Sequence, residues 1–130
     1  MAYYVDTSAL VKLVVAEDET SALRAWFGVA DRAPVASDLV RTELQRAVRR
    51  GAPKQMIAAR AVLEAVTLTD VTTEIFEAAG RLDPIGLRSL DALHIAAALD
   101  LGDDLEGLVT YDERLAEAAA ANGIVTISPC

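Results

Sequence analysis

The sequence predicts an α/β fold built around a parallel β-sheet. Short apolar runs alternate along the chain with longer segments of helical period, a pattern that is typical of repeated β-α units. The hydrophobic content of 53% includes few aromatic residues, so we expect a core of Ala, Val, Leu and Ile that suits helices packed closely on a sheet. A length of 130 residues fits a single domain over residues 1–130, and no repeat or linker divides it.

The first half of the chain is expected to contain two strands and four helices. Ala2 to Val5 forms a short apolar strand, and Pro34 to Ala36 forms a weaker one. The helices are expected at about Ser8–Val15, Glu19–Val29, Ser37–Arg50 and Lys54–Ala65. Ser37 is predicted to cap the third helix, because its hydroxyl can accept a hydrogen bond from the unpaired amides of the first turn. Gly51 and Pro53 then end that helix.

The second half is expected to contain three more strands and three more helices. We place strands at 66–68, 107–110 and 124–127, and helices at about 73–80, 90–101 and 113–121. Asp83 to Gly86 is the clearest loop. Gly102 ends the helix expected at 90–101. Thr110 and Glu113 have the spacing of a capping box, so Thr110 is predicted to cap the last helix.

The charge distribution leaves two interpretations open. A net charge of -8 argues against a protein that coats nucleic acid through bulk attraction. Six of the 12 basic residues nevertheless lie between Arg41 and Arg60, where Glu43 is the only acid. This run is either a solvated helical face or a local surface that contacts phosphate. The single cysteine, Cys130, and the absence of an apolar leader or membrane span predict a cytoplasmic protein.

Four carboxylates stand in contexts that an ordinary surface acid does not need. Asp6 closes the first strand, and Asp112 follows the strand that ends at Thr110. Glu43 lies within a helix-like segment, and Asp91 opens an apolar helical run. Ligands of an open parallel sheet collect beyond the carboxyl ends of its strands, so the four acids can face one crevice.

Convergence of these acids would require compensation. Two carboxylates about 4 Å apart repel by roughly 4 kcal/mol at an effective dielectric near 20. A fold that gathers several of them either raises their pKa values or binds a divalent cation, and an all-oxygen site favours Mg²⁺ or Mn²⁺ over zinc. The alternative is that Asp6, Asp91 and Asp112 are caps or first-turn acids, and that Glu43 is an exposed helical residue.

The polar neighbours of these acids have simpler interpretations. His94 lies three residues after Asp91 on the same helical face, but a lone histidine in an Ala/Leu-rich helix is more often a core or boundary residue. Ser8 and Thr110 are expected to fix turns and caps, although either hydroxyl could hold a water molecule bound to a metal.

The residues around the four acids resemble the four motifs of PIN-domain ribonucleases, and most closely those of VapC toxins from toxin-antitoxin modules. The matching segments are Val5–Leu10, Glu43–Leu44, Leu90–Leu99 and Val109–Leu115, in the same order and spacing. The resemblance implies a PIN-like α/β/α sandwich of three layers around a central parallel sheet. It also implies that Asp6, Glu43, Asp91 and Asp112 are the catalytic and metal-binding residues.

The resemblance further implies an endoribonuclease that cuts single-stranded or loop regions of RNA, commonly transfer or ribosomal RNA. It implies a homodimer held inactive by a VapB-like antitoxin. We expect Mg²⁺, with Mn²⁺ as its substitute, and accessory roles for Ser8, Thr110, Arg41 and Arg114. The alternatives are a PIN-like scaffold that binds partners without cutting, or a receiver-type signalling domain. A receiver needs adjacent acids after the first strand and a late lysine, and this chain has neither.

Overall fold

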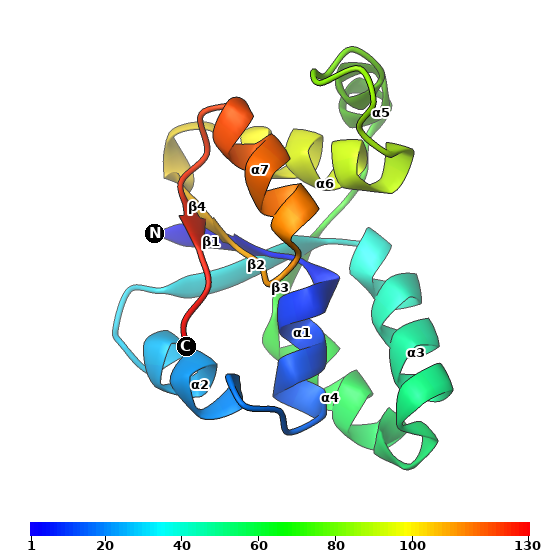
Figure 1. Ribbon diagram of the computed structural model, residues 1–130, viewed down its shortest axis with the longest axis vertical. Coiled ribbons are helices and arrows are strands. Elements are labelled where there is room, and N and C mark those ends of the chain that lie inside the picture. Colours follow the sequence, from blue (N-terminus) through cyan, green and yellow to red (C-terminus); the bar gives the residue numbers. More distant parts are fainter.

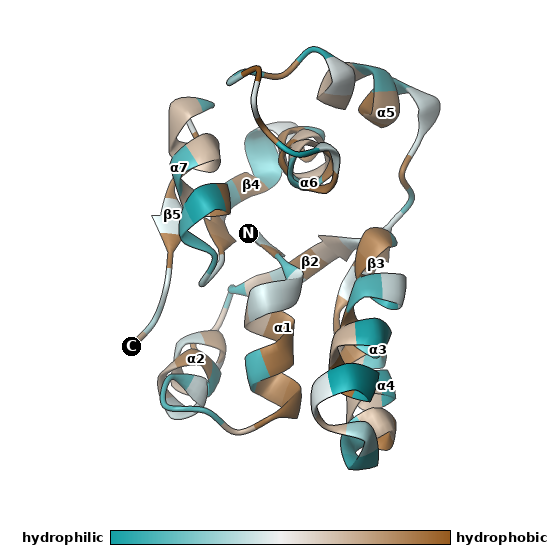
Figure 2. Ribbon diagram, turned by 45° about the vertical axis from the view of Figure 1, so that its right-hand side comes forward, coloured by the Kyte–Doolittle hydropathy of each residue, from teal (hydrophilic) through white to brown (hydrophobic).

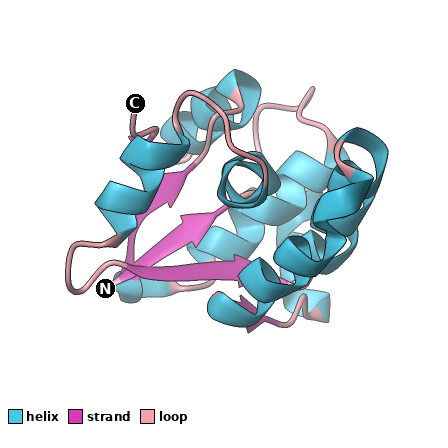
Figure 3. Ribbon diagram, turned by 90° about the horizontal axis from the view of Figure 1, so that it is seen from below, coloured by secondary structure: helices cyan, strands magenta, loops and turns pink.

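Five parallel strands form the central sheet of the computed structural model, which describes residues 1–130. The strands are β1 (Ala2–Val5), β2 (Ala33–Ser37), β3 (Thr67–Thr69), β4 (Leu105–Val109) and β5 (Thr126–Ile127). Their order across the sheet is β3-β2-β1-β4-β5, and every pairing is parallel. Figure 3 shows the strand arrows pointing the same general way with helices on both sides. The predicted α/β fold with a parallel sheet is confirmed.

Seven α-helices cover the two faces of the sheet (Figure 1). They are α1 (Thr7–Val14), α2 (Thr20–Phe27), α3 (Leu39–Gly51), α4 (Met56–Ala65), α5 (Thr73–Gly80), α6 (Ser89–Leu99) and α7 (Glu113–Ala121). Helices α1 to α4 pack on one face and α5 to α7 on the other, which gives the three layers of an α/β/α sandwich. No helix is long and apolar enough to cross a membrane.

Alternation along the central strands divides the core into two clusters. Tyr4 belongs to the cluster under α5, α6 and α7, whereas Val5 belongs to the cluster under α1 to α4. Leu108 and Val109 divide in the same way on β4. Successive side chains of a strand point to opposite faces, so one short apolar run supplies both cores. On a helix, apolar residues recur about every 3.6 residues, so apolar and polar residues alternate along it. Figure 2 shows this along α3, where brown hydrophobic and teal hydrophilic residues are mixed.

The two predicted hydroxyl caps are wrong. Ser37 is the last residue of β2, where its hydroxyl accepts a hydrogen bond from Tyr4, and α3 begins two residues later without a side-chain cap. Thr110 does not cap α7 either, because Asp112 accepts the amide hydrogen bonds of the first turn. β2 extends to include Ser37, and Thr110 follows the end of β4 and donates to Asp6, so both hydroxyls make contacts between elements.

Other boundaries differ by a few residues. A 3₁₀ turn at Pro53–Gln55 precedes α4, since proline lacks the amide hydrogen needed inside a helix. β4 begins earlier than predicted, at Leu105, and β5 is reduced to Thr126–Ile127. Pairing with a neighbouring strand decides these limits, and the apolar pattern of one segment does not contain that information.

The strand order reverses between β1 and β4. From β1 the chain builds outward through β2 to β3, and it then returns to the other side of β1 with β4 and β5. A crevice opens beyond the carboxyl ends of neighbouring strands at such a point, and it is the usual ligand site of open parallel sheets. Asp6 follows β1 directly, and Asp112 follows β4 by a short loop.

Candidate active site

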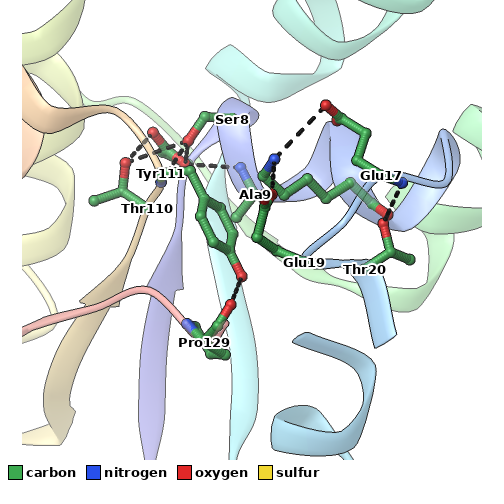
Figure 4. A network of polar contacts seen from close by, with 10 residues as sticks. Ser8, Ala9, Glu17, Glu19, Thr20, Thr110, Tyr111 and Pro129 are labelled. Carbon is green, nitrogen blue, oxygen red and sulfur yellow. Dashed lines mark hydrogen bonds and ion pairs between the residues drawn. The ribbon is translucent and has the colours of Figure 1, made fainter. Parts of the chain in front are cut away.

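Asp6 forms the buried centre of the crevice, with only 4% of its surface exposed. Its Oδ1 accepts hydrogen bonds from the Ser8 hydroxyl at 2.7 Å and the Ala9 amide at 3.1 Å, and its Oδ2 accepts one from the Thr110 hydroxyl at 2.7 Å. Figure 4 shows Ser8 and Thr110 pointing toward one another from separate segments. Burial raises the pKa of Asp6, and the three hydrogen bonds offset this only in part.

Asp112 joins the same network through Thr110. Its backbone amide donates to the Thr110 hydroxyl at 3.0 Å, while its Oδ1 accepts from the amides of Arg114 and Leu115 at 2.9 and 3.2 Å. Asp112 is therefore the N-cap of α7 and a neighbour of Asp6 at the switch point. Its Oδ2 accepts no hydrogen bond within the chain.

Asp91 lies in the first turn of α6, where the charges of other acids affect its pKa. Burial raises its pKa, and the negative charges of Asp112 and Glu43 raise it further. Arg88 and His94 oppose this shift without cancelling it. Burial is the main cause of the raised pKa of Asp91, and repulsion from Asp112 and Glu43 adds to it.

Glu43 reaches the site from α3 and is held by two donors. Its Oε1 accepts a hydrogen bond from Thr7 at 3.0 Å and lies 2.6 Å from His94 Nε2. Burial alone would raise the pKa of Glu43, but the hydrogen bond and charge of His94, together with the Thr7 hydroxyl, lower it below its ordinary value. Glu43 is thus an ionised group at the wall of the crevice.

The four acids offer a donor set of one chemical kind. Every side-chain group that the four acids contribute is an oxygen donor, which is the chemistry that Mg²⁺ and Mn²⁺ prefer. Glu43 Oε2 and Asp112 Oδ2 accept no hydrogen bond within the chain. No three Asp, Glu, His or Cys side chains are grouped closely enough to hold an ion as they stand. The donor chemistry fits the metal, whereas the grouping of the acids as ligands stays a prediction.

Arginines flank the crevice on two sides. Arg88 and Arg114 line a surface pocket of about 510 Å³ together with Asp91. Arg46 and Arg50 line a second pocket of about 710 Å³ that contains Glu43. Neither pair forms an ion pair with an acid, so all four guanidinium groups are available to an anionic ligand.

Of the two predicted accessory arginines, only Arg114 lines a pocket with one of the four acids. Arg41 instead forms an ion pair with Asp38 at 2.7 Å. Arg46 and Arg50 belong to the basic run between Arg41 and Arg60 that was interpreted as a possible phosphate-contact surface, whereas no sequence pattern pointed to Arg88. Arg46 and Arg50 follow Glu43 by three and seven residues and so share its helical face.

The sequence matches a known protein family over most of its length. The family model described as PIN domain matches residues 3–121. The chain belongs to the PIN domain family. Ribonuclease VapC47 of Mycobacterium tuberculosis (strain CDC 1551 / Oshkosh) is 42% identical over 131 residues, covering 97% of this chain and 96% of the relative. Ribonuclease VapC46 of M. tuberculosis (strain H37Rv) is 42% identical over 129 residues, covering 98% of each.

Solved structures share the fold of this PIN domain. M. tuberculosis VapC20, described as a sarcin-ricin loop cleaving toxin, superposes with a TM-score of 0.78 at 20% identity and covers 99% of this chain and 100% of its own. VapBC2 from Rickettsia felis, solved with a promoter DNA fragment, gives a TM-score of 0.74 at 15% identity with full coverage of both chains. A toxin-antitoxin complex from Klebsiella pneumoniae gives 0.71 at 21% identity, with 98% of each chain covered.

Proposed function

We propose that this PIN domain is an endoribonuclease dependent on Mg²⁺ or Mn²⁺, and the toxin of a VapBC-type toxin-antitoxin pair. Two observations carry the proposal: Thr110 links Asp6 to the backbone of Asp112 at the switch point of the sheet, and the charges of Asp112 and Glu43 act on Asp91. The identity of 42% to two proteins named ribonuclease VapC supports it.

The four carboxylates are the proposed catalytic residues. A bound divalent cation would supply positive charge for the phosphate and lower the pKa of a water molecule. Asp6 and Asp91 are the proposed principal ligands, and Asp112 and Glu43 complete the site directly or orient water. The accessory hydroxyls of Ser8 and Thr110 hold both oxygens of buried Asp6 and so fix its orientation. We place Arg114 and Arg88 at the RNA phosphates beside Asp91.

The proposed substrate is single-stranded or looped RNA, such as a segment of transfer or ribosomal RNA. A flexible strand can bend one phosphate into a recessed acidic site, whereas a duplex resists such bending. The neighbour described as cleaving the sarcin-ricin loop is consistent with a loop substrate. The unpaired arginines on either side of the crevice would balance the repulsion between a chain of net charge -8 and a polyanion.

The proposed partner is a VapB-like antitoxin, since two structural neighbours are a VapBC protein and a toxin-antitoxin complex. We propose a cytoplasmic homodimer that the antitoxin holds inactive. Membership of the PIN family sets aside the receiver domain. A PIN-like scaffold without activity is the remaining alternative, and only an assay of cleavage separates it from a nuclease.

The test is cleavage of single-stranded RNA by the purified chain, freed of any partner, in Mg²⁺, Mn²⁺ or EDTA. We expect cleavage with either cation, none in EDTA, and a loss of about 100-fold or more in Asp6→Asn, because that change removes a charged ligand. Asp103→Asn is the matched control, since Asp103 is exposed in the turn before β4, at the amino end of that strand and so opposite the site. Full activity of Asp6→Asn would refute the assignment of the site, and an inactive wild-type chain would favour the scaffold.

A further inference from the structure

His94 is a buried polar residue in a helix whose other buried residues are apolar. It is 3% exposed on α6, among Ala92, Ile95 and three further alanines. Both nitrogens of its ring have partners. Nε2 lies 2.6 Å from Glu43 Oε1, and Nδ1 lies 2.7 Å from the Tyr4 hydroxyl. The ring therefore connects the active-site wall to the first strand of the sheet.

These contacts continue into a chain of hydrogen bonds through the interior. The Tyr4 hydroxyl donates to Ser37 Oγ at 3.0 Å, and both residues are fully buried. Three strand and helix segments thereby position one imidazole: β1 through Tyr4, β2 through Ser37 and α6 through the backbone of His94. Such a chain leaves the ring little freedom to rotate, because each nitrogen already has a partner at a short distance.

The two carboxylate oxygens of Glu43 differ in their contacts. Oε1 takes the contact with His94 and the hydrogen bond from Thr7. A carboxylate has no proton to donate, so Nε2 carries the hydrogen between the two groups. Oε2 has no partner within the chain, and it does not belong to the buried atoms that lack a hydrogen bond. It is therefore accessible to a ligand in the crevice.

We propose that His94 is a positioning residue, which holds Glu43 by Oε1 so that Oε2 faces a divalent cation or its water, and that Tyr4 in turn orients the imidazole. This rests on the proposed function of the site. Outer hydrogen-bond partners of this kind orient carboxylate ligands, and their loss typically weakens metal binding by about 10–100-fold. A residue with only a packing role would change stability and leave metal affinity alone.

The test measures Mn²⁺ affinity of the full chain by calorimetry in the absence of RNA. We expect His94→Phe, which fills the space without a donor, to weaken Mn²⁺ binding by about 10-fold or more. His94→Gln places an amide N–H near the position of Nε2 and should recover most of the affinity. Tyr4→Phe should weaken binding by a smaller factor. Tyr3→Phe is its matched control, because Tyr3 packs on Trp26 on the other face of the sheet.

A double-mutant cycle with Glu43→Gln locates the effect. If His94 acts through Glu43, His94→Phe should cause little further loss of Mn²⁺ affinity in the Glu43→Gln background. Circular dichroism in EDTA establishes that each variant is folded, and if His94→Phe is not, His94→Gln and Tyr4→Phe carry the test. Wild-type affinity in His94→Phe or Tyr4→Phe, or losses that add in the double variant, would overturn the inference alone. A wild-type chain that binds no Mn²⁺ would instead overturn the metal site of the proposed function.

Discussion

Asp6 and Asp112 each have two roles that sequence analysis treated as alternatives. Asp6 accepts the Ala9 amide as the N-cap of α1, and Asp112 accepts two amides as the N-cap of α7. The Thr110 hydroxyl donates to the Asp6 carboxylate and accepts from the Asp112 backbone amide, so it links the two residues at the switch point. A cap at the start of a helix that follows a strand lies at the carboxyl end of that strand, so one position satisfies both roles.

Substitutions of Asp112 can separate these roles. Asparagine is as good an N-cap as aspartate, so Asp112→Asn should keep the free energy of unfolding within about 0.5 kcal/mol, whereas Asp112→Ala should lose about 1 kcal/mol. Both variants should lose cleavage, because both remove the charge. Urea denaturation and the cleavage assay measure the two effects. An Asp112→Asn chain that cuts RNA normally would leave only the capping role.

The pocket arginines give a prediction about salt. Arg88→Ala and Arg114→Ala should each weaken binding of single-stranded RNA. Each should also reduce the slope of log affinity against log salt by about 0.7, as expected for one lost phosphate contact. Arg24→Ala is the control, since Arg24 lies on α2 and lines neither the pocket of Asp91 nor that of Glu43. The measurement is fluorescence anisotropy with the Asp6→Asn chain, which should bind without cutting. Unchanged slopes would show that these arginines do not contact RNA phosphates.

At the scale of elements, Lys12 ties α1 to the start of α2. Its ammonium lies 2.5 Å from Glu19 and 3.7 Å from Glu17. The hydrogen bond between Lys12 and Glu19 lowers the pKa of Glu19 and raises the pKa of Lys12. The short connection between the two helices therefore depends on ionised side chains as well as on packing.

The lowered pKa of Glu19 predicts the direction of a pH effect. The contribution of an acid with a lowered folded pKa is present above its unfolded value of 4.5 and is lost as the pH falls through the folded value. Glu19→Gln should therefore be less stable than the wild type at pH 7, and the difference should shrink toward pH 3. Urea denaturation at both pH values measures it. A difference that grows in acid would contradict the sign of the shift.

At the scale of the whole molecule, the fold brings negative charges from different elements near Asp91. Asp91 has a raised pKa because burial and the charges of Asp112 and Glu43 disfavour its ionised form. Its charge therefore opposes folding when no cation is bound, and assists binding of a cation when one is present. Such a site lowers the stability of the metal-free chain and favours binding of a cation.

The raised pKa of Asp91 predicts opposite effects of one substitution. Asp91→Asn should raise the melting temperature in EDTA and abolish the rise that Mn²⁺ gives in the wild type. A ligand at 100 times its Kd, bound only by the folded state, stabilises by about 2.7 kcal/mol, which corresponds to several degrees for a chain of this size. Differential scanning fluorimetry measures both effects. An unchanged wild-type melting curve in millimolar Mn²⁺, or an equal rise in Asp91→Asn, would contradict the site.

The sequence by itself determined the α/β class and the approximate strands and helices, and it singled out four carboxylates as candidate site residues. These features depend on local periodicity and on motifs that lie within one stretch of chain. Only the tertiary structure decided that Ser37 extends a strand, that Asp112 and not Thr110 caps α7, and that His94 joins Glu43 to Tyr4. Ser37 and His94 contact residues distant in sequence, and the Thr110 hydroxyl donates to the distant Asp6, so these outcomes become visible only when the sheet has brought its elements together.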